Sequence, residues 1–216
     1  MADNNEIIYF RRKISTWSKL NYISYPWRET DNKWHSLVAE IMLQKTRAIK
    51  VLRIYNFFIE KYPDASSFIS SYRKDNWNVF ETLGLLKRYE MFIKMAKEID
   101  ANGMPNSKEG FQKLPGVGEY VSSAMMSLHC GKREIILDSN IMRFISRLKG
   151  FYQIQEGERI KMIKKYLERL VPNSNDIKIF NYSLLDFSMI ICKPTPNCID
   201  CPLKRKCAFI KKRRGL

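Results

Sequence analysis

Four cysteines with the spacing of metal ligands stand near the C-terminus. They are separated by five, two and five residues, and they are Cys192, Cys198, Cys201 and Cys207. Four thiolates this close in the chain can hold either a tetrahedral zinc ion or a [4Fe–4S] cluster, and spacing alone does not separate the two. The clustering is typical of a metal site and not of a disulfide framework. Cys130 stands apart from them and is expected to be a small buried residue.

A glycine-rich turn of sequence LPGVG precedes a helix that we expect to begin near Glu119. Backbone N–H groups and the helix dipole favour an anion at such a point, and glycines allow its close approach. Main-chain donors read phosphate and not base, so the turn would fix position on DNA without sequence preference. An ordinary helix–helix turn is the alternative. The expected phosphate-binding residues are Leu114, Gly116, Val117 and Gly118.

Two acidic residues have apolar neighbours in the sequence. Glu40 lies within the run VAEIM, and Asp138 follows Ile135–Leu137. An unpaired carboxylate is costly to bury, so Glu40 is expected either to hold a proton, which suits a proton donor, or to pair with a cation such as Arg28. Asp138 is also well placed to cap a helix that follows it, a role compatible with a catalytic one.

The charge of the chain points to a polyanionic partner. Lys and Arg number 38 against 22 Asp and Glu, a formal net charge of +16. Such an excess is expected where phosphates are bound. No apolar run reaches the length of about 18 residues that a membrane helix requires, and the first residues do not form a signal peptide. We therefore expect an intracellular protein that does not associate with membranes and that is a monomer.

Apolar residues at helical spacing predict the elements that position these side chains. Shorter helices are expected to begin at Pro63 and to carry Trp77, Val79 and Leu83. The run Ile135–Leu137 could form a strand by composition but has no partner, so the prediction is an all-α protein. The longer expected helices span residues 5–20, 34–45, 47–62, 87–99, 139–148, 157–170 and 176–192.

Several separated motifs occur in one order along the chain: PWR, AEIMLQKT, LPGVGEY, LDSNIMRFISRL and the four cysteines. In this set, from about Pro26 to Cys207, the chain resembles the helix-hairpin-helix DNA glycosylases related to endonuclease III and the adenine DNA glycosylases. The resemblance implies two helical lobes flanking a DNA-binding groove. A six-helix barrel-like domain with the hairpin would span residues 28–137. A discontinuous helical domain with the cysteine cluster would combine residues 1–27 and 138–216.

The resemblance also implies roles for individual residues. Asp138 would face the sugar of an extruded nucleotide and stabilise the positive charge that develops as the glycosidic bond breaks. Glu40, from across the groove, would protonate or hydrogen-bond the departing base. Asn140 matches a position that orients the aspartate, although an exposed residue at a helix start is an equally simple account. Either Gln44 or Lys45 would fill the gap left by the flipped base, unless both belong to a solvated helix end.

Tyr120 indicates the branch of the family. Bifunctional members carry a lysine at this position, whose amine attacks C1′ and leads to strand cleavage. Tyrosine cannot do this, so the resemblance implies hydrolysis by water, and it favours the G:T mismatch-specific thymine and uracil glycosylases. A core aromatic residue is the alternative interpretation of Tyr120.

The family usually holds a [4Fe–4S] cluster with cysteine intervals of six, two and five residues. Here the first interval is one residue shorter. The resemblance still favours the cluster over zinc. Either would be structural and would present the loop of Lys204, Arg205 and Lys206 to the DNA backbone.

Taken with the resemblance, these residues predict a monofunctional DNA glycosylase of base excision repair. It would remove thymine or uracil mispaired with guanine in double-stranded DNA and leave an abasic site. An adenine or other damaged-base glycosylase on the same fold is one alternative. A non-catalytic DNA-binding protein is another alternative. The presence of Glu40 and Asp138 argues against it. His35 and His129 lie in no ligand pattern and receive no role.

Overall fold

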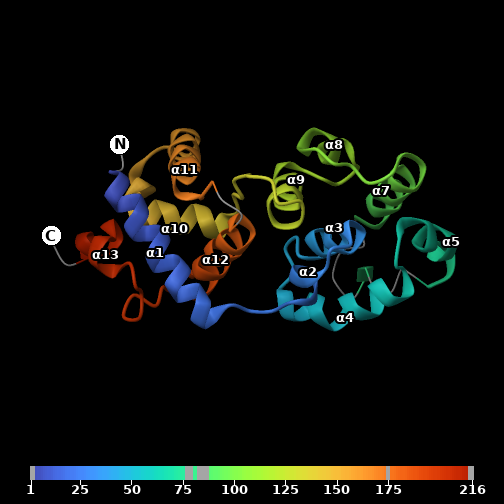
Figure 1. Ribbon diagram of the computed structural model, residues 1–216, viewed down its shortest axis with the longest axis horizontal. Coiled ribbons are helices and arrows are strands. Elements are labelled where there is room, and N and C mark those ends of the chain that lie inside the picture. Colours follow the sequence, from blue (N-terminus) through green and yellow to red (C-terminus); the bar gives the residue numbers. More distant parts are fainter. Residues whose placement is uncertain (1–2, 76–79, 82–87, 174–175, 214–216) are drawn as a thin grey trace. The chain divides into compact units, whose positions relative to one another are not determined.

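The computed structural model describes residues 3–75, 80–81, 88–173 and 176–213 (Figure 1). Over these residues the chain forms helices joined by turns and contains no strand, which confirms the all-α prediction. Residues 135–137 form a connection without strand pairing. In the same ranges no helix has an apolar stretch that would reach across a bilayer.

The chain divides into two compact units. The contiguous unit is Ser24–Cys130. The split unit combines Met1–Ile23 with Gly131–Leu216, so its helices come from both ends of the chain.

Short helices build the contiguous unit. They are α2 (Pro26–Glu29), α3 (Lys33–Met42), α4 (Ala48–Lys61), α5 (Ala65–Asp75), α7 (Tyr89–Asn102), α8 (Lys108–Lys113), α9 (Glu119–Ala124) and the π-helix η2 (Met125–His129).

Aromatic side chains fill the core of this unit. Phe58 of α4 packs against Phe68 of α5 and Phe92 of α7, with ring centroids 5.7 and 6.0 Å away. Phe80 lies 4.9 Å from Phe92, and all of these rings are buried. Tilted and edge-to-face ring contacts of this kind add to the stabilisation from burying the rings. It fixes α4, α5 and α7 as a frame against which α3 packs.

The split unit contains α1 (Asn4–Asn21), α10 (Ser139–Lys149), α11 (Glu156–Leu170), α12 (Ile177–Ile190) and α13 (Ala208–Arg213), with short 3-10 turns η3 (Phe151–Gln153) and η4 (Lys204–Lys206). Its core forms where α12 meets α1 and α10. Phe187 of α12 lies 5.1 Å from Trp17 of α1 and 5.0 Å from Phe144 of α10.

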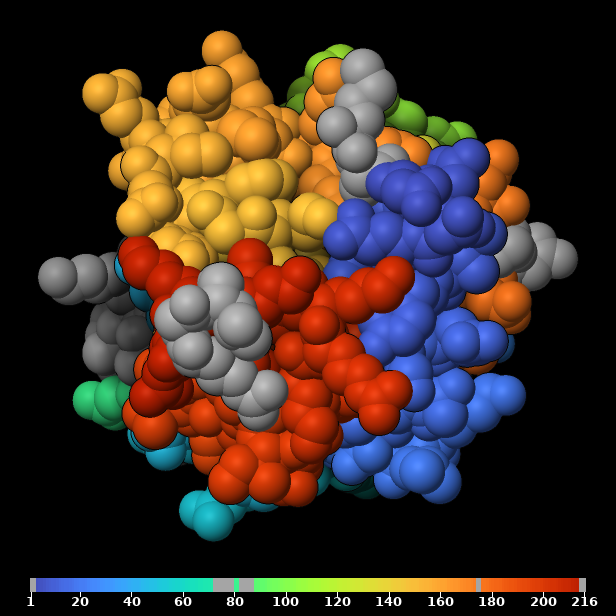
Figure 2. All heavy atoms as spheres, turned by 90° about the vertical axis from the view of Figure 1, so that its left-hand side faces the viewer, coloured from blue at the N-terminus to red at the C-terminus, as the bar shows by residue number. Residues whose placement is uncertain are grey.

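The C-terminal segment lies alongside α1, as the red and blue surfaces of Figure 2 show. Nζ of Lys206 stands 4.8 Å from the ring centre of Tyr9, and Arg11 of α1 donates to the backbone oxygens of Leu170 and Arg169 at the end of α11. These contacts hold the N-terminal helix within the split unit.

The longer predicted helices are present. They correspond to α1, α3, α4, α7, α10, α11 and α12, with ends that differ by a few residues from those expected. The predicted helix that carries Trp77, Val79 and Leu83 lies largely outside the described residues; Phe80 and Glu81, which are described, are helical.

Candidate functional site

The glycine turn joins α8 to α9 in a tight hairpin. Leu114 and Val117 anchor it in the core, each about 95% buried, and the N–H of Val117 donates to the oxygen of Leu114 at 3.1 Å. Gly116 has a φ of +83°, and a Cβ added there would stand 3.2 Å from Cγ of Met91, so glycine is required by the fold. Gly118 has an ordinary φ of −93° and open space where a Cβ would be. The fold itself does not require glycine at this second position.

Gly118 is the N-cap of α9, and no side chain of the described residues caps this helix. The first N–H groups of such a helix and the positive end of its dipole favour an anion. Two contacts fasten α9 to α8: Nζ of Lys108 lies 3.0 Å from Oε1 of Glu119, and Gln112 donates to Oε2 at 2.7 Å. The hairpin thus holds a set of backbone donors in a fixed orientation.

Glu40 lies near the end of α3, a helix capped by Asn32, whose side chain accepts from the N–H groups of Trp34 and His35. Glu40 is 2% exposed and lies on the apolar face of α3, which packs on the core. Oε1 of Glu40 lies 3.1 Å from Nε2 of His129. Arg28 is buried as well, with its guanidinium 5.2 Å from the ring centre of Tyr25.

Asp138 is the N-cap of α10, in the split unit. Oδ1 accepts a hydrogen bond of 2.7 Å from the N–H of Ile141, and Oδ2 accepts one of 2.8 Å from Nδ2 of Asn140. The capping role allowed by the sequence is therefore present. Because each carboxylate oxygen has a donor, the half-buried side chain is held in one orientation.

Arg143 continues this set of hydrogen bonds one turn along α10. It donates to Oδ1 of Asn140 at 3.0 Å, to the backbone oxygen of Cys192 at 2.9 Å and to that of Ser188 at 3.1 Å. The position of the Asp138 carboxylate is thus tied, through Asn140 and Arg143, to the end of α12 and the start of the cysteine segment.

The four cysteines line one pocket of the split unit, together with apolar side chains that include Phe144, Leu148 and Ile191. All four are free thiols, and burial raises the pKa of Cys201 to about 12. Four sulfur donors in an apolar pocket suit a thiolate-bound group, whose metal would displace the thiol protons. Within the described residues, no group of three or more His, Cys, Asp or Glu side chains is arranged to hold a single metal ion.

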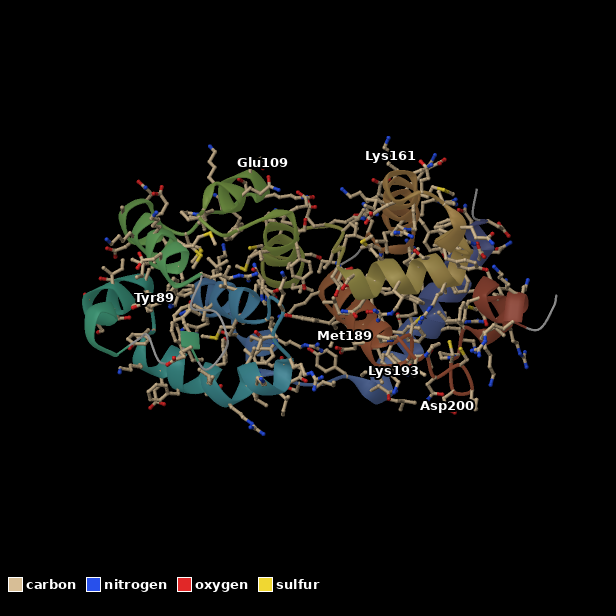
Figure 3. The ribbon with its side chains drawn as sticks, turned by 180° about the vertical axis from the view of Figure 1, so that it is seen from behind. Tyr89, Glu109, Lys161, Met189, Lys193 and Asp200 are labelled. Atoms are coloured by element: carbon tan, nitrogen blue, oxygen red, sulfur yellow. The ribbon has the colours of Figure 1, made fainter. Side chains whose placement is uncertain are left out.

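Neighbouring groups support the cysteine segment. Nη1 of Arg147 lies 3.8 Å from Sγ of Cys192 and donates to the backbone oxygen of Lys193 at 2.8 Å. Lys193 and Asp200, each adjacent in sequence to a cysteine, lie on this loop of the split unit (Figure 3). The side chains of η4, Lys204, Arg205 and Lys206, are exposed beside it.

Comparisons with known proteins place the chain in a family, although no family model matches it. It is 33% identical over 215 residues to the thymine-DNA glycosylase of Aeropyrum pernix, with 96% of each chain covered. It is 31% identical over 216 residues to the thymine/uracil-DNA glycosylase of Methanothermobacter thermautotrophicus, covering 98% of this chain and 97% of that one. The chain belongs to this DNA glycosylase family. A solved structure of a thermostable thymine-DNA glycosylase has the same fold, with a TM-score of 0.88 at 30% identity over 97% of this chain and 98% of that one.

Membership confirms the family and the class of enzyme that the sequence motifs predicted, a DNA N-glycosylase. In this glycosylase the residues of the predicted site belong to both units: Glu40, Tyr120 and the hairpin to the contiguous unit, Asp138 and Asn140 to the split unit. Tyr120 is half-buried and packs against the edge of the core.

The two candidate wedge residues of the glycosylase differ in their surroundings. Gln44 is half-buried, and its side-chain oxygen accepts a hydrogen bond from Arg88. Lys45 is exposed and has a φ of +63°, the left-handed region that non-glycine residues rarely adopt. Strain of this kind often marks a functional position.

One contact of the glycosylase was missed by sequence reasoning, which assigned no role to His129. The residue ends an almost wholly buried helical run, residues 121–128, and this burial places it beside Glu40. The signal available in the sequence was a histidine at the end of this buried run. Its partner is 89 positions away and could not be named from the sequence.

Proposed function

We propose that this glycosylase removes thymine or uracil paired with guanine from double-stranded DNA, by hydrolysis, and leaves an abasic site. The observation that carries the proposal is the near full-length similarity to relatives named thymine- or thymine/uracil-DNA glycosylase. The conformations of the predicted site residues support the chemistry, residue by residue.

Asp138 stabilises the charge that develops on the sugar. Cleavage of the bond between C1′ and the base nitrogen leaves positive charge on C1′ and the ring oxygen, and an oriented carboxylate lowers the free energy of that state. The hydrogen bonds from Ile141 and Asn140 hold the carboxylate oriented before substrate binds. The same carboxylate can take a proton from the water that attacks C1′.

Glu40 assists the departure of the base. The electron pair of the broken bond remains on the base, and a proton or hydrogen bond from a neutral carboxyl group stabilises it there. Its burial keeps water away from the carboxyl group.

Tyr120 restricts the reaction to hydrolysis. A phenol at this position offers no amine for Schiff-base formation, and the flanking residues Glu119 and Val121 supply none either. The sugar product therefore stays an abasic site on an intact strand.

The hairpin and the turn after α3 hold the DNA. The first N–H groups of α9 bind a backbone phosphate, and the open space at Gly118 allows that phosphate close approach. Lys45 is the wedge that enters the space of the flipped base, because its side chain is exposed whereas that of Gln44 is bonded to Arg88.

The four cysteines hold a [4Fe–4S] cluster, with zinc as the alternative. Four sulfur donors in one apolar pocket suit either group, and the resemblance to the endonuclease III family, whose members usually hold a cluster, favours the cluster. When bound, the group would fix the segment that includes η4 against α10.

Incubation with duplexes containing G:T, G:U, A:G and A:8-oxoguanine, followed by alkali, tests the proposal. We expect cleavage after alkali only with G:T and G:U, and intact strands without alkali. Cleavage confined to A:G or A:8-oxoguanine would instead identify an adenine glycosylase. Affinity for these duplexes without cleavage of any would identify a binding protein.

A further inference from the structure

His129 and Glu40 form an ion-pair contact in the interior of the contiguous unit. Their side chains are 1% and 3% exposed, and the distance from Nε2 to Oε1 is 3.1 Å. At this distance a hydrogen bond joins the carboxyl group and the imidazole. Either the carboxyl donates to the imidazole, or the imidazole donates to the carboxylate.

A local feature of the backbone brings the two residues together. After α9 the helix continues as the π-helix η2, which ends at His129 and packs against α3. π-Helical turns are rare and occur mostly at functional positions. Here the turn sets the last residue of a buried helix against the acid of its neighbour.

The pair has a property that neither residue has alone. An ionised Glu40 in this interior would be costly without a compensating charge, and so would a protonated His129. One proton placed between a neutral imidazole and a carboxylate makes the pair neutral, whichever of the two groups holds it. Glu40 can therefore face a base with its carboxyl group fixed in direction and with a proton in place.

We propose that His129 is the positioning residue of Glu40: through their hydrogen bond it orients the carboxyl group that assists the departure of the base. This inference rests on the proposed function of Glu40. In the reaction the bond from C1′ to the base breaks with its electron pair going to the base, and the Glu40 proton passes to a base oxygen or nitrogen. Water adds to C1′ and gives its proton to Asp138, from which it returns to solvent. The pair, left with one negative charge, regains a proton from solvent before the next turnover.

Three variants test this role. His129→Gln keeps a side-chain amide at the position but cannot carry a proton, Glu40→Gln removes the acid, and a double variant combines them. His35→Gln is the matched control, because His35 is the other histidine of the chain and bonds the backbone oxygen of Pro63 from the same helix as Glu40.

We expect His129→Gln to lower the single-turnover rate of base release from a G:T duplex by about 10- to 100-fold, the range of one positioned acid or base. Affinity for a duplex that carries an uncleavable 2′-fluorothymidine opposite guanine should change less than about twofold, and Tm should be kept. The double variant should be no slower than Glu40→Gln, since both changes remove one function. Wild-type rates in His129→Gln, or fully multiplicative losses in the double variant, would refute the inference.

NMR of the ring nitrogens tests the pair without any activity. His35→Gln assigns the two imidazoles, after which Glu40→Gln should move the ring-nitrogen signals of His129 and leave those of His35 in place. If the protein releases no base from any duplex, the proposed function fails while this measurement still decides the contact. Unmoved His129 signals would rule out the hydrogen bond with Glu40.

Discussion

Nδ2 of Asn140 donates a 2.8 Å hydrogen bond to Oδ2 of Asp138, while the other oxygen of that carboxylate caps α10. One side chain thus begins a helix and presents a fixed carboxylate. The first variant separates these two roles.

Asp138→Asn should lose activity and keep the fold. Asparagine caps helices about as well as aspartate, so the free energy of unfolding should change by only a few tenths of a kcal/mol and Tm should change little. The loss of negative charge beside C1′ should lower the single-turnover rate by about 100-fold or more. Asp138→Ala, which also removes the cap, should in addition lose about 1 kcal/mol of stability. Unchanged turnover in Asp138→Asn would exclude the residue from the chemistry.

Tyr120→Lys should add strand cleavage. The aliphatic part of lysine can lie where the half-buried ring packs, with its amine at the polar end. We expect strand breaks without alkali and a covalent adduct trapped by borohydride. Tyr120→Phe, which supplies no amine, is the control and should give neither product.

The two glycines of the hairpin should respond differently to alanine. Gly116→Ala places a Cβ in the left-handed region and 3.2 Å from Met91, so it should lose about 1–2 kcal/mol of stability. Gly118→Ala meets no protein atom within 4 Å and should keep its Tm. Its DNA affinity should fall by about tenfold if a phosphate approaches there. Full affinity in Gly118→Ala would contradict the phosphate contact.

Lys45→Gly tests the wedge and its backbone strain together. Glycine adopts a φ of +63° without steric cost, so stability should be retained or rise by up to about 1 kcal/mol. Without a side chain to fill the stack, the rate of thymine release from a G:T duplex should fall. Lys50→Ala removes a charge from an exposed site on α4 and serves as the control for charge alone. Equal losses in the two variants would exclude a wedge at Lys45.

Removal of one cysteine should remove the metal. We expect the purified protein to show broad visible absorbance and iron by elemental analysis, and Cys201→Ser to lose both. Cys130→Ser, which changes the cysteine outside the pocket, should keep them. Zinc without visible absorbance in the wild-type protein would replace the cluster with the alternative metal.

Sequence reasoning succeeded where the determinant is local. The helices follow from apolar periodicity, the cap at Asp138 from its place before an amphipathic run, and the turn at Gly116 from a residue type that its φ requires. The contacts that orient the acids are not local. His129 lies 89 positions from Glu40 along the chain, and Arg143 donates a hydrogen bond to Cys192, which is 49 positions away. Such pairs depend on how helices pack, and a π-helical turn leaves no reliable signature in a single sequence.

The division of the chain also sets an order of synthesis and folding. Ser24–Cys130 is one continuous segment, so it can fold on the ribosome once it has emerged. The α1 helix emerges earlier, but the helices that cover its apolar face begin only after Gly131. During translation Ile7, Phe10 and Ile14 therefore stay exposed while the contiguous unit forms. In a nascent chain stalled near residue 130, chaperones that bind apolar segments should recognise the exposed face of α1.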